Sequence, residues 1–206
     1  MKYIKRTLER VLTRVVQEFP VVMLTGPRQA GKTTLLKYLL AKSHQYISME
    51  LPDIQAAANS DPRGFLELYP PPVIFDEVQY APGLFPYIKE HVDAHRDRTG
   101  QYILTGSQNL LLAQRVTESL AGRAAVLRLL PLTFRETLNK PQAPLPWEAK
   151  VQRQRRGAVY RDLWKSLLRG GVPGAGGKSK ARYNPMASQL CSDLSREGCP
   201  LPTTDR

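Results

Sequence analysis

A chain of 206 residues with 42% hydrophobic side chains is long enough for one α/β domain with a sizeable core, alone or with part of a second domain. This composition argues against wholesale disorder, and no run approaches the roughly 20 apolar residues of a membrane-spanning helix. The N-terminus is charged throughout and lacks the apolar core of a secretory signal, so we expect a cytoplasmic protein with no membrane attachment.

The formal net charge is +12, of which residues 1–140 contribute +5 and residues 141–206 contribute +7. Clustered Lys and Arg attract polyanions, so a nucleic-acid partner stays open. More than half of the excess lies in the last third of the chain, which weakens that hypothesis. The two cysteines, Cys191 and Cys199, have no nearby histidine and do not form a zinc site pattern.

Hydrophobic periodicity and turn residues predict strands that alternate with helices along the first 130 residues. This alternation is typical of a parallel sheet covered by helices on both faces, an α/β fold. The texture changes after Pro131, and residues 139–146 are rich in proline. The predicted elements are a helix over 5–18, a strand over 21–25, a helix over 34–42, a strand over 45–49, two short helices within 53–68 that are separated at Asp61-Pro62, a strand over 73–75, a helix over 84–96, a strand over 101–105, a helix over 108–121 and a strand over 124–130.

The segment GPRQAGKT (26–33) fits G-x-x-x-x-G-K-[ST] between a strand and a helix, the context that a phosphate-binding P-loop requires. Glycines let successive backbone N–H groups point at phosphate oxygens, and the helix start adds its positive dipole end. Lys32 would neutralise the β- and γ-phosphates, and Thr33 would place its hydroxyl on Mg²⁺. The residues expected to bind ATP are Gly26, Pro27, Arg28, Gln29, Ala30, Gly31, Lys32, Thr33 and Thr34.

The segment VIFDEVQ (73–79) predicts the acidic half of the same site. Three apolar residues deliver Asp76 to the carboxyl edge of a central strand, where ligands bind in such sheets. Asp76 would hold Mg²⁺ directly or through water. Glu77 would orient and deprotonate the attacking water. The alternative is an acidic N-cap for the following helix.

Three further residues are candidates for catalysis. The fourth strand ends in ILTGSQ (103–108). In ATPases with an adjacent Asp-Glu pair, a polar residue at this strand's tip lies between the catalytic acid and the γ-phosphate, and Ser107 and Gln108 are the candidates; the alternative for Ser107 is the N-cap of the next helix. Arg123 precedes the fifth strand and is a candidate arginine finger, acting in cis or from a neighbouring subunit of a homo-oligomer. A solvated or structural arginine is the alternative.

The motifs GPRQAGKTTL, VIFDEVQ, ILTGSQ and SLAGRAAVLRLLPLTFRE, in this order, resemble a family of prokaryotic AAA-like ATPases, usually named only as ATP-binding or AAA domain-containing proteins. The resemblance covers residues 1–170. It implies a P-loop NTPase of the ASCE class, a three-layer sandwich around a central five-stranded parallel sheet. It also implies a second, C-terminal domain that is sometimes suspected of contacting nucleic acid.

The C-terminal sequence departs from that family. Members typically carry a stretch like W-x-x-S-Y-V-Q-T-Y-L-E-R-D-V where this chain has NPMASQLCSDLSREGCP (184–200). Met186 followed by Ala187 gives tryptophan when the reading frame shifts by one base, and synonymous codons then allow WHRSYVQTYLERDVR. We therefore expect a one-base frameshift near Val172–Gly174 and a truncated second domain; a genuine divergent tail is the alternative.

These patterns predict how the chain is organised. We expect an N-terminal helix packing on the core (1–19), an ATPase domain (20–138), a linker and the start of a truncated domain (139–173), and an out-of-frame, disordered tail (174–206).

The predicted function is Mg²⁺-dependent hydrolysis of ATP to ADP and phosphate. Three alternatives remain: a nucleotide-dependent switch with little turnover, a nucleic-acid-associated protein in which ATP is secondary, and an inactive truncated gene product.

Overall fold

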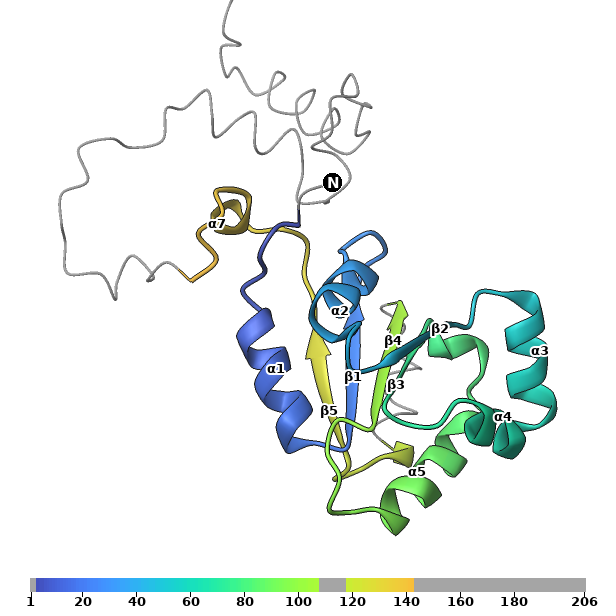
Figure 1. The fold of residues 1–206 in the computed structure, drawn as a ribbon. Coiled ribbons are helices and arrows are strands. Elements are labelled where there is room, and N and C mark those ends of the chain that lie inside the picture. Colours follow the sequence, from blue (N-terminus) through green and yellow to red (C-terminus); the bar gives the residue numbers. More distant parts are fainter. Residues whose placement is uncertain (1–2, 108–117, 143–206) are drawn as a thin grey trace, which may run out of the picture.

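The computed structural model describes residues 3–107 and 118–142. Within them, five parallel strands form one sheet in the order β2-β3-β4-β1-β5, so β4 lies between β1 and β3 (Figure 1). The predicted α/β fold with a central five-stranded parallel sheet is confirmed. The strands are β1 (Val21–Gly26), β2 (Gln45–Ser48), β3 (Val73–Asp76), β4 (Tyr102–Ser107) and β5 (Ala124–Arg128).

Two helices cover one face of the sheet, α1 (Glu9–Glu18) and α2 (Lys32–Leu40) (Figure 1). Because side chains alternate across a strand, every second residue of β1 meets these helices. Val22 and Leu24 of β1 share a buried cluster with Leu12 of α1 and Leu35 of α2. This layer fixes α2, and therefore the loop before it, against β1.

Three helices cover the other face, α3 (Pro52–Ser60), α4 (Pro62–Leu68) and α5 (Leu84–Ala94) (Figure 1). The break between α3 and α4 falls where the sequence predicts it. Pro62 takes the first position of α4, and the Asp61 carboxylate accepts a hydrogen bond from the N–H of Gly64 (3.0 Å). The Phe75 ring stacks on Tyr102 and meets Phe65 at a tilt in this layer, which completes the three-layer sandwich.

Two short helices are additional to the predicted elements: a 3₁₀ turn, η1 (Val78–Tyr80), and α7 (Phe134–Thr137). Neither is long enough to show apolar periodicity. The start of α7 does carry a sequence signature, because Thr133 and Glu136 form a capping box. The N–H of Thr133 donates to Glu136 (2.8 Å), and the N–H of Glu136 donates to the Thr133 hydroxyl (3.3 Å).

The first helix starts later than predicted, at Glu9 instead of residue 5. The backbone amides of Arg6 and Thr7 donate to side chains, to Glu9 (2.6 Å) and Glu136 (2.7 Å) respectively, and residues 7 and 8 form a turn in front of the helix. Periodicity could not reveal the contact with Glu136, because that residue lies 129 positions along the chain from Thr7.

Several predictions fall outside the described residues: most of the helix over 108–121, and the linker and tail beyond residue 142. Within the part of the chain that the structure describes, no helix is both long and apolar enough to cross a membrane.

The packing of α1 predicts a large effect at Leu12, whose side chain is fully buried. Leu12→Ala should lower the free energy of unfolding by about 2–5 kcal/mol, because the cavity opens between α1 and the sheet. Urea denaturation of the full chain measures this. Arg14→Ala, on the exposed side of α1, should stay within about 0.5 kcal/mol of the wild type. Equal stability of the Leu12 and Arg14 variants would show that α1 does not belong to the core.

Candidate functional site

The predicted phosphate loop (residues 26–33) connects the end of β1 to the first turn of α2. Gly26, Gln29 and Gly31 have positive φ angles of 151°, 62° and 91°. Two features exclude a side chain at Gly26: its positive φ angle, and the carbonyl oxygen of Leu129, which would lie 2.2 Å from a Cβ. The close approach of the segment after β5 thus requires glycine at the start of the loop.

The remaining loop residues differ in exposure. Ala30 is buried, Pro27 is half-buried, and Arg28 and Gln29 are exposed. Thr34, in the first turn of α2, is also exposed. The role of each of these residues in nucleotide binding stays a prediction.

The Lys32 side chain turns back over the loop. Its ammonium group donates to the carbonyl oxygens of Gly26 (3.1 Å) and Pro27 (3.3 Å), and it lies 4.0 Å from a carboxylate oxygen of Glu77. Only 5% of the Lys32 side chain is exposed. A buried ammonium group needs compensation, and here loop carbonyls and one carboxylate supply it.

Asp76 is the centre of the site, at the carboxyl end of β3 and 5% exposed. Three hydroxyl groups from three different elements donate to its carboxylate. Thr33 of α2 donates to Oδ2 (2.8 Å), Tyr46 of β2 donates to the same oxygen (2.5 Å), and Thr105 of β4 donates to Oδ1. The two residues predicted as metal ligands, Thr33 and Asp76, are therefore in contact.

The hydroxyl of Tyr46 stays protonated beside the Asp76 carboxylate. Burial, together with the hydrogen bond to Asp76 and its negative charge, raises the pKa of Tyr46 well above the ordinary value. The hydroxyl thus stays a donor over the physiological range and holds the Asp76 carboxylate in place.

Glu77 has a left-handed backbone (φ 57°, ψ 48°), an uncommon conformation for a residue with a side chain. Two contacts hold it there. Its N–H donates to the hydroxyl of Thr105 (3.1 Å), and its carboxylate accepts a hydrogen bond from the side-chain amide of Gln79 (2.5 Å). The turn brings the Glu77 carboxylate toward Lys32 and the phosphate loop.

Of the two candidates at the tip of β4, only Ser107 lies within the described residues. Its backbone pairs with Gly26, so the end of β4 lies directly beside the start of the phosphate loop. Gln108, and the helix that Ser107 would cap, fall outside the described part of the chain. Their roles stay predictions.

The sequence profile of a family described as "AAA domain" matches residues 18–138, more than half of the chain. The chain belongs to this family of AAA-like P-loop ATPases. The match begins near the end of α1 and extends through α7, so it includes every element that carries the site.

Two curated relatives match this chain, each named only as an uncharacterized protein, from Mycobacterium bovis and Mycobacterium tuberculosis. Each is 36% identical over 126 residues, which is 61% of this chain and 28% of the relative. The matched region thus spans less than a third of the relatives' length.

Solved structures share the fold of the AAA domain. A Walker-type ATPase of Pyrococcus abyssi has a TM-score of 0.55 and 18% identity, over 92% of this chain and 75% of that one. AMPPCP-bound DnaA from Aquifex aeolicus has a TM-score of 0.50 and 16% identity, over 95% of this chain and 64% of that one. At these identities the likeness is one of fold.

Three residues that contact Asp76 or Glu77 were not predicted. Thr105 and Gln79 lie within motifs that the sequence pointed to. A polar residue inside an apolar strand was the available signal. No sequence signal marked Tyr46, because a tyrosine in a strand is ordinarily a packing residue.

The structure corrects one alternative for Arg123. Its carbonyl oxygen accepts a hydrogen bond from the N–H of Val21, at the start of β1, whereas the phosphate loop begins at Gly26. Val21 and Gly26 are the two ends of β1 and lie roughly 16 Å apart along the strand. Arg123 lies at the amino ends of the strands, whereas the phosphate loop lies at their carboxyl ends. The prediction that Arg123 acts on the phosphate loop of the same subunit is therefore wrong. Action on a neighbouring subunit stays a prediction.

In this position the Arg123 guanidinium forms a two-pronged ion pair with Asp93 of α5 (2.7 and 3.0 Å). The hydrogen bonds from Arg123 hold the pKa of Asp93 below its ordinary value. The pair joins α5 to the amino end of β5, which is the structural role that the sequence left open.

The Asp93 shift predicts a pH dependence. A lowered folded-state pKa contributes stability above the unfolded value near 3.9, and that contribution is lost as the pH falls through the folded pKa. Arg123→Met should therefore be less stable than the wild type at pH 7, and the difference should shrink below about pH 4. Urea denaturation across this range measures it, with Arg128→Met as the control. A difference that does not change with pH would contradict the ion pair.

The contacts of Thr105 predict a second stability effect. Thr105→Val keeps the shape but removes the hydroxyl that serves both Asp76 and Glu77, so a buried carboxylate loses a donor. The free energy of unfolding should fall by about 1–3 kcal/mol. Thr13→Val, which removes an exposed hydroxyl from α1, is the matched control and should change stability by less than about 0.5 kcal/mol. Similar values for both variants would sink this account of the Asp76 site.

Proposed function

We propose that this AAA domain binds ATP with Mg²⁺ at the phosphate loop and hydrolyses it to ADP and phosphate. One observation carries the proposal: two pairs of side chains that the motifs assign to this chemistry meet at one edge of the sheet. Thr33 contacts Asp76 at 2.8 Å, and Lys32 lies 4.0 Å from Glu77. Strand order brings these pairs together, because parallel strands end at the same edge.

The residues present fit the phosphates and the metal. The loop supplies backbone amides, the first turn of α2 and the Lys32 ammonium group, which suit a polyanion. The hydroxyl of Thr33 and the carboxylate of Asp76 are oxygen ligands of the kind that Mg²⁺ takes beside phosphate. When bound, the metal would neutralise charge that develops on the phosphate oxygens.

In the proposed reaction Glu77 accepts a proton from the attacking water, and the water oxygen forms a bond to the γ-phosphorus as the bond to the β–γ bridging oxygen breaks. The left-handed turn at Glu77 aims the carboxylate toward this region. Lys32 stabilises negative charge on the phosphate oxygens. Tyr46 and Thr105 hold Asp76 in position through their hydroxyl groups.

A P-loop contacts the phosphates and not the nucleobase, so the base that this site prefers is a separate question. The fold shared with DnaA, whose solved structure holds AMPPCP, makes adenine nucleotides the first to test.

A second candidate function is a nucleotide switch with little intrinsic turnover. The contact that favours it is the hydrogen bond from Gln79 to Glu77 (2.5 Å), because a carboxylate held by an amide is less available to a water. In that case a partner would have to shift Glu77 before hydrolysis. Turnover that rises when Gln79 is replaced by Leu would support the switch.

Phosphate release from Mg·ATP, together with ATP binding, tests the proposed enzyme on the full chain. Glu77→Gln should retain ATP binding but lose about 10²- to 10⁴-fold in kcat, because the general base is removed. Glu90→Gln, the same change at an exposed position of α5, is its matched control. Unchanged turnover in Glu77→Gln would rule out the assigned role.

Lys32→Ala should weaken ATP binding by about tenfold or more, because a buried cation facing phosphate is lost. Lys42→Ala, at an exposed site beyond α2, controls for the loss of a lysine and should bind as the wild type does. Chelation of Mg²⁺ should abolish turnover in every variant. Equal ATP affinity in the Lys32 and Lys42 variants would contradict binding at this loop.

A further inference from the structure

Arg6 is a buried cation that the proposed reaction does not use. It lies in the segment before α1 and is 5% exposed. Its guanidinium donates from Nη1 to the carbonyl oxygen of Ala30 (2.8 Å) and from Nη2 to the carbonyl oxygen of Leu130 (2.6 Å). One side chain therefore joins the phosphate loop to the segment that follows β5.

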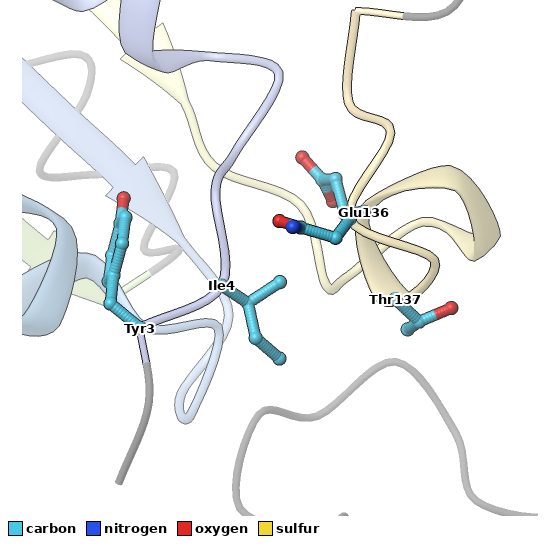
Figure 2. Close-up of a pocket in the computed structure, with 5 residues that line it drawn as sticks. Tyr3, Ile4, Glu136 and Thr137 are labelled. Carbon is cyan, nitrogen blue, oxygen red and sulfur yellow. The ribbon is translucent and has the colours of Figure 1, made fainter.

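The third edge of the guanidinium faces Glu136 of α7, with Nε 3.3 Å from Oε1. Burial alone would raise the pKa of Glu136, but hydrogen bonds from the amides of Thr7 and Thr133 and the charge of Arg6 outweigh it, and the pKa is lowered. Glu136 thus stays ionised and neutralises Arg6. Glu136 lines a hollow of about 160 Å³, and Figure 2 shows the N-terminal segment and α7 on its two sides.

The bond to Ala30 has a geometric consequence for the loop. In a trans peptide the carbonyl oxygen and the following N–H point in opposite directions. Because Arg6 holds the Ala30 oxygen, the N–H of Gly31 is turned to the side opposite Arg6. Gly31 has a positive φ of 91° and few steric limits, so its peptide could rotate if nothing held it.

We propose that Arg6 is a positioning residue for the phosphate loop: it fixes the peptide between Ala30 and Gly31 so that the loop amides point at the bound phosphates. The inference rests on the proposed nucleotide binding. A lysine could not serve equally, because the planar fork of arginine reaches the Ala30 and Leu130 oxygens at once. The competing account is that Arg6 only fastens α7 to the domain.

Affinity for Mg·ADP in two variants of the full chain separates these accounts. Arg6→Met alone leaves Glu136 buried without its cation and can fail to fold. The comparison is therefore between Glu136→Gln, in which Arg6 keeps its two carbonyl acceptors, and the double variant Arg6→Met/Glu136→Gln, in which both charges are absent; the two variants differ only at Arg6. Calorimetric titration well below the melting temperature of both reports the Kd of folded molecules, which a purely structural role leaves unchanged.

The double variant should bind Mg·ADP about tenfold more weakly than Glu136→Gln, because the loop loses the bond that orients it. Equal affinities in these two variants, with binding lost in Lys32→Ala, would overturn the role of Arg6 and leave the proposed function standing. Wild-type protein that binds no Mg·ADP, or binds it as well after Lys32→Ala, would overturn both.

Discussion

A carboxylate buried at the edge of a sheet is costly unless its oxygens are bonded, and at Asp76 three hydroxyl groups meet this need. Each comes from a different element, so α2, β2 and β4 must all be in place before the charge is compensated. The site is therefore a product of the whole sheet. Its stability and its geometry depend on the same three contacts.

The strand order explains why these contacts exist at all. Insertion of β4 between β1 and β3 places Thr105 next to the acidic pair, and the parallel direction puts all strand ends at one edge. The same direction puts Arg123 at the opposite edge, since it precedes its strand. The local sequence shows that Arg123 precedes its strand. Its distance from the phosphate loop becomes clear only when the strands are assembled into the sheet.

Much of the fold was accessible from the sequence, because apolar runs, Asp61-Pro62 and the phosphate loop are local signals. The centre of the site was accessible for the same reason, through the spacing of residues 26–33 and 73–79. The partners that orient those residues were not. Tyr46 reaches Asp76 from 30 residues away and Arg6 reaches Leu130 across 124, and no periodicity encodes such pairs.

The planar guanidinium of Arg6 contacts both α7, through Glu136, and the phosphate loop, through the carbonyl oxygen of Ala30. Where two events share such a group, thermodynamic linkage makes their coupling reciprocal. If nucleotide binding tightens the hold on α7, then a force or a partner that draws α7 away must weaken nucleotide binding by the same factor. Nucleotide binding and the attachment of α7 to the domain would thus influence each other in both directions.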